Sequence, residues 1–211
     1  GFAFDGDGDR LIVVDEKGME IDGDKIIALF ATHLTKLNKT NSKFPVITTV
    51  MSNLGFEKYL LNKLKIKLKR SSVGDINVIK EMGKFNSILG GEQSGHIILS
   101  NFSKTGDGIL AALKVIEIIS KNNKTTSKSF RLYESFPQNK VNISYKKVLT
   151  KNLKFIENLN KEKLKDKNMR ILIRKSGTEP LIRLLVEGRD INKVQEYSKY
   201  YEKKIRIKLE K

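Results

Sequence analysis

The stretch Asp5-Gly6-Asp7-Gly8-Asp9-Arg10, near the start of the chain, is the point from which the rest of the sequence can be interpreted. Carboxylates on alternate residues of a tight turn converge on one point, and the glycines between them permit the turn and leave the approach open. Three anionic groups in one place repel each other unless a cation lies among them. Oxygen donors alone favour Mg²⁺, Mn²⁺ or Ca²⁺, so Asp5, Asp7 and Asp9 are candidate ligands of a divalent metal.

The residues on either side of this stretch predict a strand before it, at 2–4, and another after it, at 11–14. Two other interpretations compete with a metal loop between strands. A solvated acidic turn rarely alternates three aspartates with two glycines. A calcium-binding EF-hand loop requires glycine at its sixth position, where this chain has Arg10, and a helix on each side. We therefore expect a metal-binding loop between two strands.

The composition limits the classes of protein to which the chain can belong. Its 211 residues suffice for one large or two ordinary domains, and an apolar fraction of 39% suffices for a core. The absence of cysteine excludes disulfides, thiol catalysis and cysteine-bound zinc. No apolar stretch reaches the ~18 residues of a membrane-spanning helix, and no signal-peptide pattern opens the chain. We expect a cytoplasmic protein with no membrane partner.

The formal net charge of +17 is compatible with a nucleic-acid partner. The lysines, however, are scattered over every segment and do not alternate with aromatic residues, as they do in proteins that bind single strands. Lysine, asparagine and isoleucine are abundant together, which is typical of an AT-rich genome. We therefore expect no specific nucleic-acid partner, and a basic nucleic-acid-binding module is the less favoured interpretation.

Strand and helix patterns alternate over the first part of the chain. They indicate an α/β domain with a mixed or largely parallel sheet and helices on both faces. Strands are predicted at 45–50, 66–69, 87–89 and 97–99, and helices at 22–37, 53–64, 76–82 and 105–119, the first capped by Asp22 and the last by Thr105. The polar, lysine-rich stretch 121–129 predicts a linker. Beyond it, strands at 141–145, 169–174 and 181–187 with two helices predict a smaller α+β domain.

A second group of functional residues is Gly91-Glu92-Gln93-Ser94-Gly95-His96. Glu92 can accept two hydrogen bonds from hydroxyl groups, Ser94 can donate or accept one, and the glycines let a ligand come close. Such a loop suits the adjacent hydroxyls of a sugar, with an ordinary glycine-rich turn as the alternative. His96 is a candidate proton carrier near neutral pH.

The third group is Arg174-Lys175-Ser176-Gly177-Thr178-Glu179-Pro180, with Arg183 beyond it. Arginine binds phosphate through two parallel hydrogen bonds, and a backbone opened by glycine adds N–H donors. The spacing and the ending differ from those of a P-loop. A plain turn between strands is the alternative, but it does not explain why hydroxyl and cationic side chains gather here. The sequence therefore predicts an anion site.

A metal loop, a hydroxyl-binding loop and a phosphate loop, in that order, describe an enzyme that acts on phosphosugars. The chain resembles the C-terminal half of an α-D-phosphohexomutase, and the resemblance extends over nearly its whole length. Gln93 points to the branch of this family that acts on glucosamine phosphates. The stretches that carry the resemblance are Ala3-Phe4-Asp5-Gly6-Asp7-Gly8-Asp9-Arg10, Val50-Met51-Ser52-Asn53-Leu54-Gly55, Gly90-Gly91-Glu92-Gln93-Ser94-Gly95-His96, Thr105-Gly106-Asp107-Gly108 and Arg174-Lys175-Ser176-Gly177-Thr178-Glu179-Pro180.

The resemblance implies the interconversion of glucosamine 6-phosphate and glucosamine 1-phosphate through a phosphoserine and a bisphosphate intermediate, in a pathway that feeds amino-sugar and cell-wall synthesis. The three aspartates would hold Mg²⁺ against the phosphoserine. Arg10 would help to neutralise the transferring phosphoryl group, and His96 would carry a proton. The residues that would bind the phosphosugar are Glu92 and Ser94 for the hydroxyls, and Arg174, Ser176, Gly177, Thr178 and Arg183 for the phosphate that is not transferred.

The family's phosphoserine motif lies in a first half that this sequence does not contain. We therefore expect the missing N-terminal half of the same enzyme as a partner, and an isolated fragment without activity. The expected domains are the end of a metal-binding α/β domain at 1–20, an α/β sugar-binding domain at 21–130 and an α+β phosphate-binding domain at 131–211. Ile76 departs from the family pattern, because the glucosamine branch usually has a basic residue there.

Three alternatives to this function remain open from the sequence. One is a phosphomannomutase or phosphoglucomutase of the same family, although these enzymes usually differ at the position of Gln93. A non-catalytic phosphosugar-binding remnant would keep the same loops. A phosphatase with an aspartate nucleophile is disfavoured, because such enzymes usually carry threonine or valine two residues after the second aspartate, where this chain has Asp9.

Overall fold

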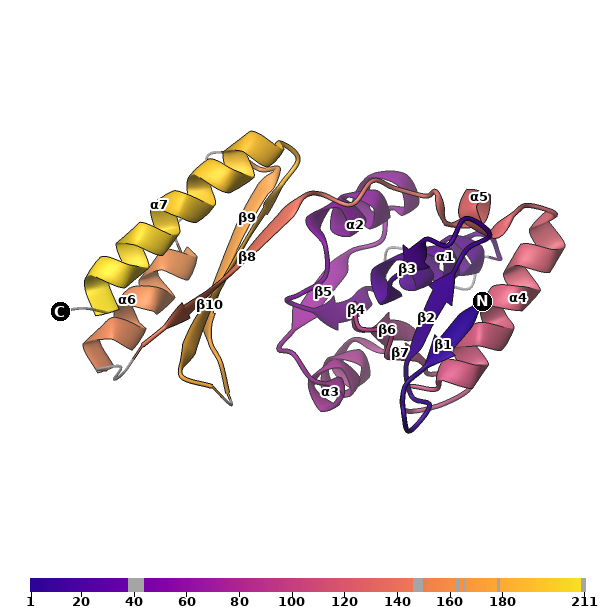
Figure 1. The fold of residues 1–211 in the computed structure, drawn as a ribbon. Helices are drawn as coiled ribbons and strands as arrows, with labels where there is room; N and C mark the ends of the chain where they lie inside the picture. Colours follow the sequence, from indigo (N-terminus) through magenta and orange to yellow (C-terminus); the bar gives the residue numbers. More distant parts are fainter. Residues whose placement is uncertain (38–43, 146–149, 162–163, 165, 178, 210–211) are drawn as a thin grey trace. The chain divides into compact units, whose positions relative to one another are not determined.

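A computed structural model describes residues 1–37, 44–145, 150–161, 164, 166–177 and 179–209 of the chain. The chain divides into two compact units, Gly1–Glu134 and Ser135–Lys211 (Figure 1). The stretch 121–129, predicted as a linker, instead forms the end of α4 and most of α5. The linker prediction is wrong because Phe130 at the end of α5 is buried in the core of the first unit, which holds the polar stretch before it against that unit.

A four-stranded sheet with the order β5-β4-β6-β7 forms the centre of the first unit. Strand β4 pairs in parallel with β5 and β6, and β7 returns antiparallel to β6. This is the mixed, largely parallel sheet that the sequence predicts. The bounds are Val46–Thr49 for β4, Leu68–Ser71 for β5, Leu89–Gly91 for β6 and Ile97–Leu99 for β7.

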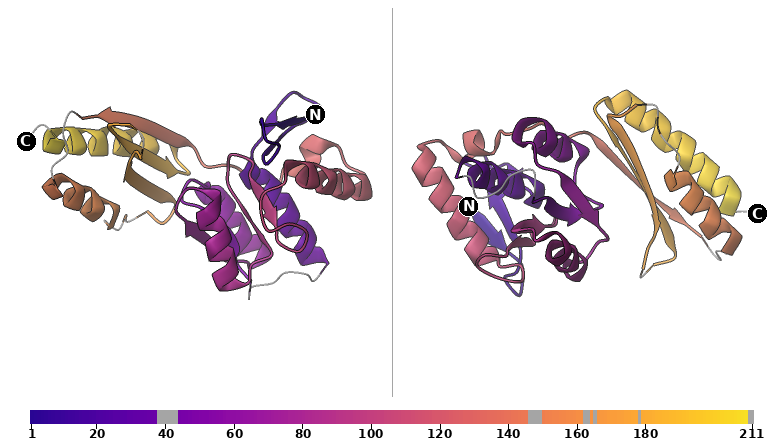
Figure 2. Two further views of the ribbon diagram at one scale, coloured as in Figure 1. Left: turned by 90° about the horizontal axis from the view of Figure 1, so that it is seen from below. Right: turned by 180° about the vertical axis from the view of Figure 1, so that it is seen from behind.

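Helices cover both faces of this sheet (Figure 2). Val46 packs in the larger hydrophobic core, together with α1 (Gly23–Lys36) and α4 (Gly108–Asn122). Its neighbour Ile47 points to the other face, where it packs with residues of α3 (Asp75–Phe85). Because both faces are covered, every residue of the central strand β4 is buried, as is usual in parallel sheets. Three short helical segments complete the layer: α2 (Leu54–Tyr59), a π-helical turn (Leu60–Leu64) and α5 (Thr126–Phe130).

A separate three-stranded antiparallel sheet precedes α1 in the chain. Its strands are β1 (Phe2–Phe4), β2 (Leu11–Val14) and β3 (Glu20–Ile21). The alternate residues Leu11 and Val13 of β2 are buried in the large core, whereas every residue of β1 is exposed. This small sheet is thus attached to the rest of the first unit through β2.

The two long helices of the core begin at aspartate caps. Asp22 caps α1, as predicted, by accepting a hydrogen bond from the Lys25 N–H at 3.1 Å. The cap of α4 is Asp107 rather than the predicted Thr105, because the Asp107 carboxylate reaches the Leu110 N–H at 2.8 Å. The buried face of α4 consists of Ala111, Ala112, Val115 and Ile118, while Ile109, Leu113 and Ile116 are exposed.

The second unit is the predicted α+β arrangement, an antiparallel sheet with the order β8-β10-β9. Helices α6 and α7 lie on one face of it (Figure 2), where Ile156 of α6 and Val194 of α7 pack against Ile182 of the central strand. Among the described residues of both units, no helix has the length and apolar character that crossing a bilayer requires. The bounds are Gln138–Ser144 for β8, Thr150–Lys161 for α6, Met169–Lys175 for β9, Leu181–Gly188 for β10 and Ile191–Leu209 for α7.

One acidic side chain is enclosed in the first unit. Asp24, in the first turn of α1, is fully buried, and its Oδ2 accepts a hydrogen bond from the Asn53 N–H at 2.7 Å. Burial, and next the negative charge of Asp22, raise the pKa of Asp24 to about 7. Because the pKa of Asp24 is higher in the folded state than in the unfolded state, its contribution to stability is fully present below about pH 4. That contribution is lost as the pH rises towards about 7.

We predict that Asp24→Asn removes this loss. Asparagine stays neutral and can still accept from Asn53, so the variant should gain stability over the unchanged chain as the pH rises from about 4 to about 7, by on the order of 3 kcal/mol. The measurement is urea unfolding at several pH values, followed by NMR signals of the first unit. Glu20→Gln, at an exposed position, is the control. Parallel pH curves for Asp24→Asn and the unchanged chain would contradict the assignment.

Candidate functional site

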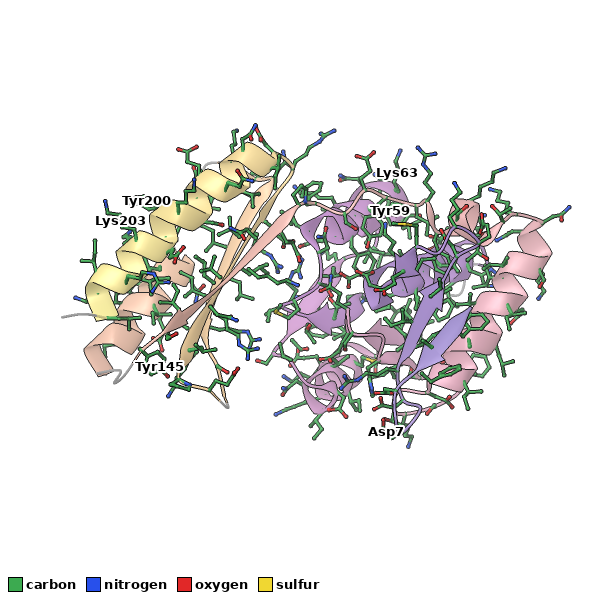
Figure 3. The ribbon with its side chains drawn as sticks, in the orientation of Figure 1. Asp7, Tyr59, Lys63, Tyr145, Tyr200 and Lys203 are labelled. Atoms are coloured by element: carbon green, nitrogen blue, oxygen red, sulfur yellow. The ribbon has the colours of Figure 1, made fainter. Side chains whose placement is uncertain are left out.

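The turn between β1 and β2 brings the three predicted metal ligands together. One carboxylate oxygen from each of Asp5, Asp7 and Asp9 lies within 4.8 Å of the others, and Asp7 lies at the exposed tip (Figure 3). The turn depends on Gly8, whose φ of 73° suits glycine and whose N–H donates to the Asp5 carbonyl at 3.2 Å. The buried Oδ1 of Asp9 has no hydrogen-bond partner among the described residues. Such an oxygen, beside two other carboxylates, fits a divalent cation.

Arg10 stays beside the aspartates that it follows. Its backbone N–H donates to Asp5 Oδ1 at 3.1 Å, and its Nε lies 3.5 Å from Asp5 Oδ2 and 3.7 Å from Asp9 Oδ1. The side chain is 50% exposed, so its outer nitrogens face solvent and can meet an incoming anion. The predicted role of Arg10 beside a phosphoryl group stays a prediction.

The turn between β6 and β7 holds the predicted sugar-binding residues. The Gly95 N–H donates to the Glu92 carbonyl at 3.0 Å, in a turn that Gly95 permits with its φ of 97°. The Glu92 carboxylate accepts from the Gly74 N–H at 2.8 Å and from the Ser94 hydroxyl at 3.3 Å. Glu92 is therefore held between the ends of β6 and β5. The carboxyl ends of parallel strands are where α/β sheets bind ligands.

The metal loop (residues 5–10) and the sugar loop (residues 91–96) are joined to each other. Arg10 and His96 form an isolated antiparallel bridge, and the Leu11 N–H donates to the Gly95 carbonyl at 3.0 Å. His96 is only 2% exposed. Its Nδ1 lies 3.1 Å from Asp9 Oδ2, and its Nε2 accepts from the Gly106 N–H at 3.2 Å. The two loops thus form one continuous site within the first unit.

Each of the two long helices begins directly against one of these loops. The Gly23 N–H, at the start of α1, donates to the Gln93 carbonyl at 3.0 Å, and the Gly108 N–H, at the start of α4, donates to the Gly8 carbonyl at 3.0 Å. A Cβ atom at position 23 would lie 2.1 Å from the Glu92 carbonyl oxygen, and one at position 108 would lie 2.6 Å from that of Arg10. Only glycine lets the helices approach so closely.

Three of the contacts are ones that the sequence did not reveal. The stretch around Gly106 is recognisable as a motif, but only the fold shows that it supports His96 and the metal loop. Gln93 directs its side chain to the α1 cap, with Nε2 3.3 Å from Asp22 Oδ2. The sequence also gave no sign of the Gly74 contact to Glu92. Ile76, which stands in place of a basic residue, is 74% exposed in the first turn of α3.

The predicted phosphate residues lie in the second unit. Arg174 of β9 and Arg183 of β10 are directly opposite each other. Like charges at such positions destabilise a sheet unless an anion lies between them. Burial, and next the charge of Arg183, lower the pKa of Arg174. Arg183 pairs with Glu179 at 2.5 Å, but its buried Nε has no partner in the part of the chain that the structure describes.

The remaining residues of the phosphate loop differ in their surroundings. Ser176 is buried at the end of β9, and its N–H donates to the Leu181 carbonyl at 2.8 Å. A Cβ atom at Gly177 would meet no described atom within 4 Å, so the described residues leave a ligand room to approach its backbone. Thr178 lies outside the described residues. The described part of the loop therefore offers two arginines and an open backbone.

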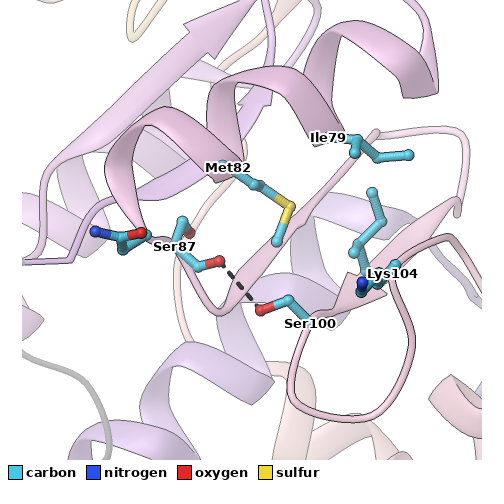
Figure 4. Close-up of a pocket in the computed structure, with 8 residues that line it drawn as sticks. Ile79, Met82, Ser87, Ser100 and Lys104 are labelled. Atoms are coloured by element: carbon cyan, nitrogen blue, oxygen red, sulfur yellow. Dashed lines mark hydrogen bonds between the residues drawn. The ribbon is translucent and has the colours of Figure 1, made fainter.

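A cavity of about 370 Å³ lies elsewhere, at the C-terminal end of α3 (Figure 4). Ile79, Met82 and Ile98 contribute its apolar wall, and Lys104 lies at its side. The Ser100 hydroxyl donates to the Ser87 carbonyl at 3.2 Å across this wall. The described residues that line this cavity include no candidate site residue, so the cavity is separate from the joined loops.

Comparison with known proteins places the chain in a family. The family model described as phosphoglucomutase/phosphomannomutase, alpha/beta/alpha domain III, matches residues 22–136. The model for the C-terminal domain of the same family matches residues 139–203. The chain therefore belongs to the phosphoglucomutase/phosphomannomutase family.

Two curated relatives carry the same name. Phosphoglucosamine mutase from Wolinella succinogenes is 45% identical over 192 residues, which cover 90% of this chain and 42% of that protein. The enzyme of the same name from Campylobacter fetus is 47% identical over 210 residues, covering 95% of this chain and 46% of that protein. The chain thus spans less than half the length of the relatives that it matches.

Solved structures show the same fold. N-acetylphosphoglucosamine mutase from Aspergillus fumigatus, in complex with GlcNAc-6P and magnesium, is 19% identical with a TM-score of 0.78 and covers 99% of this chain and 48% of that chain. A phosphoglucomutase/phosphomannomutase family protein from Burkholderia thailandensis is 22% identical with a TM-score of 0.79, covering 98% of this chain and 46% of that chain. At this identity the likeness establishes the fold alone.

We predict that Gly23→Ala destabilises the first unit by about 2 kcal/mol, because the new methyl group must displace the Glu92 backbone. Gly83→Ala is the matched control. Gly83 also lies in a helix, but its Cβ would meet nothing within 4 Å, so alanine should stabilise α3 by about 1 kcal/mol. Urea unfolding measures both changes. A gain in stability for both variants would show that the start of α1 does not pack tightly against the sugar loop.

Proposed function

We propose that this chain is the C-terminal part of a cytoplasmic phosphoglucosamine mutase. The reaction interconverts glucosamine 6-phosphate and glucosamine 1-phosphate through a phosphoserine enzyme and a bisphosphate intermediate. The observation that carries the proposal is the continuous site in which His96 joins the three aspartates to the Glu92 loop. The family membership and the shared name of the curated relatives support it.

In this proposal Asp5, Asp7 and Asp9 hold Mg²⁺, which offsets negative charge on the phosphoryl group during its transfer. The protein's own contribution is positioning and charge. Arg10 is held beside the aspartates by two ion pairs, so its guanidinium meets the same phosphoryl group without having to reorganise. The partner that brings the phosphoserine is the N-terminal half of the same enzyme. Residues 1–20 then complete a domain of that half.

Glu92 and Ser94 bind hydroxyl groups of the sugar. The Gly74 N–H and the Ser94 hydroxyl orient the Glu92 carboxylate, and each of its oxygens keeps a lone pair for a further hydrogen bond. Arg174 and Arg183 bind the phosphate that stays on the sugar, with Ser176 and the Gly177 backbone beside them. Such an anion would remove the repulsion between the two opposed guanidinium groups. Thr178 completes this loop in the proposal.

We predict that Arg174→Gln weakens the binding of inorganic phosphate to the chain by about tenfold, because a charge-assisted hydrogen bond is lost. The measurement is an NMR titration that follows the amide signals of Ser176 and Gly177. Arg206→Gln is the control, since Arg206 lies on α7 and pairs with Glu202. Equal weakening in both variants would mean that only the net charge of the chain attracts phosphate.

We predict that the 211-residue chain alone does not interconvert the glucosamine phosphates, even with Mg²⁺ and glucose 1,6-bisphosphate, because it lacks the phosphoserine. A chimera that joins the N-terminal part of the Wolinella succinogenes relative to this chain should do so, and its Asp7→Asn variant should not. Phosphorus NMR measures the conversion. Turnover by the chain alone, or a chimera that prefers mannose 6-phosphate, would contradict the proposed function.

A further inference from the structure

We propose that the cavity at the C-terminal end of α3 binds a small carboxylate with an apolar body. The described residues that line the cavity belong to none of the metal, sugar and phosphate loops, so this inference stands independently of the proposed function. The cavity volume of about 370 Å³ falls within the range of about 300–1,000 Å³ that is usual for small-molecule sites. The wall of the cavity and the charge beside it indicate which class of molecule fits.

The cavity forms where α3 covers only part of one face of the central sheet. The helix packs over β4, β5 and β6, and β7 is the edge strand beyond β6. Met82 of α3 and Ile98 of β7 belong to the small hydrophobic core on this face, and Ile79 packs against that core (Figure 4). The accessible wall of the cavity is mostly apolar. Covering this wall with an apolar group removes its surface from water, which is favourable.

The helix presents a face with a missing side chain to the cavity. Four residues of α3 line the cavity at positions i, i+3, i+4 and i+7, which lie on one helical face: Ile79, Met82, Gly83 and Asn86. Alanine is more favourable than glycine inside a helix, yet this face has Gly83. A Cβ atom at Gly83 would meet no described atom within 4 Å, so packing between the described residues does not require the glycine. A large side chain at this position would take up the space that a ligand needs.

The hydroxyl groups of the cavity are already used to fix its wall. The Ser87 hydroxyl donates to the Pro45 carbonyl at 2.6 Å, and the Ser100 hydroxyl donates to the Ser87 carbonyl at 3.2 Å. The Ser100 N–H donates to the Ile88 carbonyl at 3.1 Å, so the end of β7 is held against the start of β6. The wall is thus formed before a ligand arrives, which lowers the entropic cost of binding.

Lys104 supplies a positive charge beside the apolar wall. Its side chain is exposed, and it forms no ion pair or hydrogen bond within the described ranges. The described lining includes no acidic side chain, and Asn86 adds an uncharged amide. A carboxylate accepts hydrogen bonds and carries the opposite charge, so it can pair with Lys104 while its apolar body lies against Ile79 and Met82. An anion without such a body would meet only an exposed ammonium group, which binds weakly in water.

The first test uses octanoate as the probe, below the concentration at which it forms micelles, and follows the amide NMR signals of Gly83 and Ser100. We expect saturable shifts at these two residues and none at Gly6 and Gly8 of the metal loop. Acetate, which lacks the apolar body, and 1-octanol, which lacks the charge, should each bind at least about fivefold more weakly. Equal binding of 1-octanol would overturn the carboxylate assignment, and octanoate binding that leaves Gly83 and Ser100 unaltered would overturn the site.

The second test changes the cavity itself. Lys104→Gln should weaken octanoate binding by about fivefold, because the charge is lost. Gly83→Leu should remove the saturable shift of Ser100, because the leucine side chain fills the space. Lys84→Gln is the matched control for charge, since Lys84 also lies near the end of α3 but pairs with Glu81 and is not among the described lining residues. It should bind octanoate as the unchanged chain does.

The outcomes separate this inference from the proposed function. Equal weakening in Lys104→Gln and Lys84→Gln would mean that only the net charge of the chain attracts octanoate, which would overturn the role of Lys104. Unaltered binding in Gly83→Leu, with the dispersed amide signals of β7 retained, would place octanoate outside the cavity and overturn the proposal. Mg²⁺ and phosphate take no part in these titrations, so either failure leaves the proposed function as it stands.

Discussion

The contact between two glycine-containing turns is the constraint on which the rest of the first unit depends. The backbones of Arg10 and His96 pair there, and the Leu11 N–H binds the Gly95 carbonyl. A small sheet and a large one are joined at this point, although neither continues into the other. Because the chemistry-bearing residues lie on the two turns themselves, the contact that joins the sheets also assembles the site.

The helices reinforce this contact from two sides. Gly23 and Gly108, at the starts of α1 and α4, each donate a backbone hydrogen bond to one turn, and neither has room for a side chain. The first turns of a helix also carry unpaired N–H groups and a partial positive charge, which suit the carbonyls and carboxylates of both loops. The N-terminal ends of the helices therefore hold the shape of the loops, while their sides build the core.

The sequence predicts the residue types of the site better than the long-range contacts that bring them together. Alternating aspartates and glycines are a local pattern, so the metal loop at Asp5 could be predicted without the fold. The buried face of α4 could not, because apolar residues surround that helix and periodicity alone cannot select a side. The contacts of Gly74 and Gly106 also could not be predicted, because each is a hydrogen bond from a backbone N–H to a residue that is distant in sequence. The linker prediction failed for a related reason, because composition does not show that Phe130 is buried.

Strand β1 has a consequence for the behaviour of the chain in solution. It pairs with β2 along one edge, all of its residues are exposed, and two of them are Phe2 and Phe4. An apolar edge strand with unpaired backbone groups is a template for another strand, and natural proteins usually protect such edges with charge, proline or a covering segment. Such an edge favours self-association of the chain at high concentration, whereas the net charge of +17 opposes it.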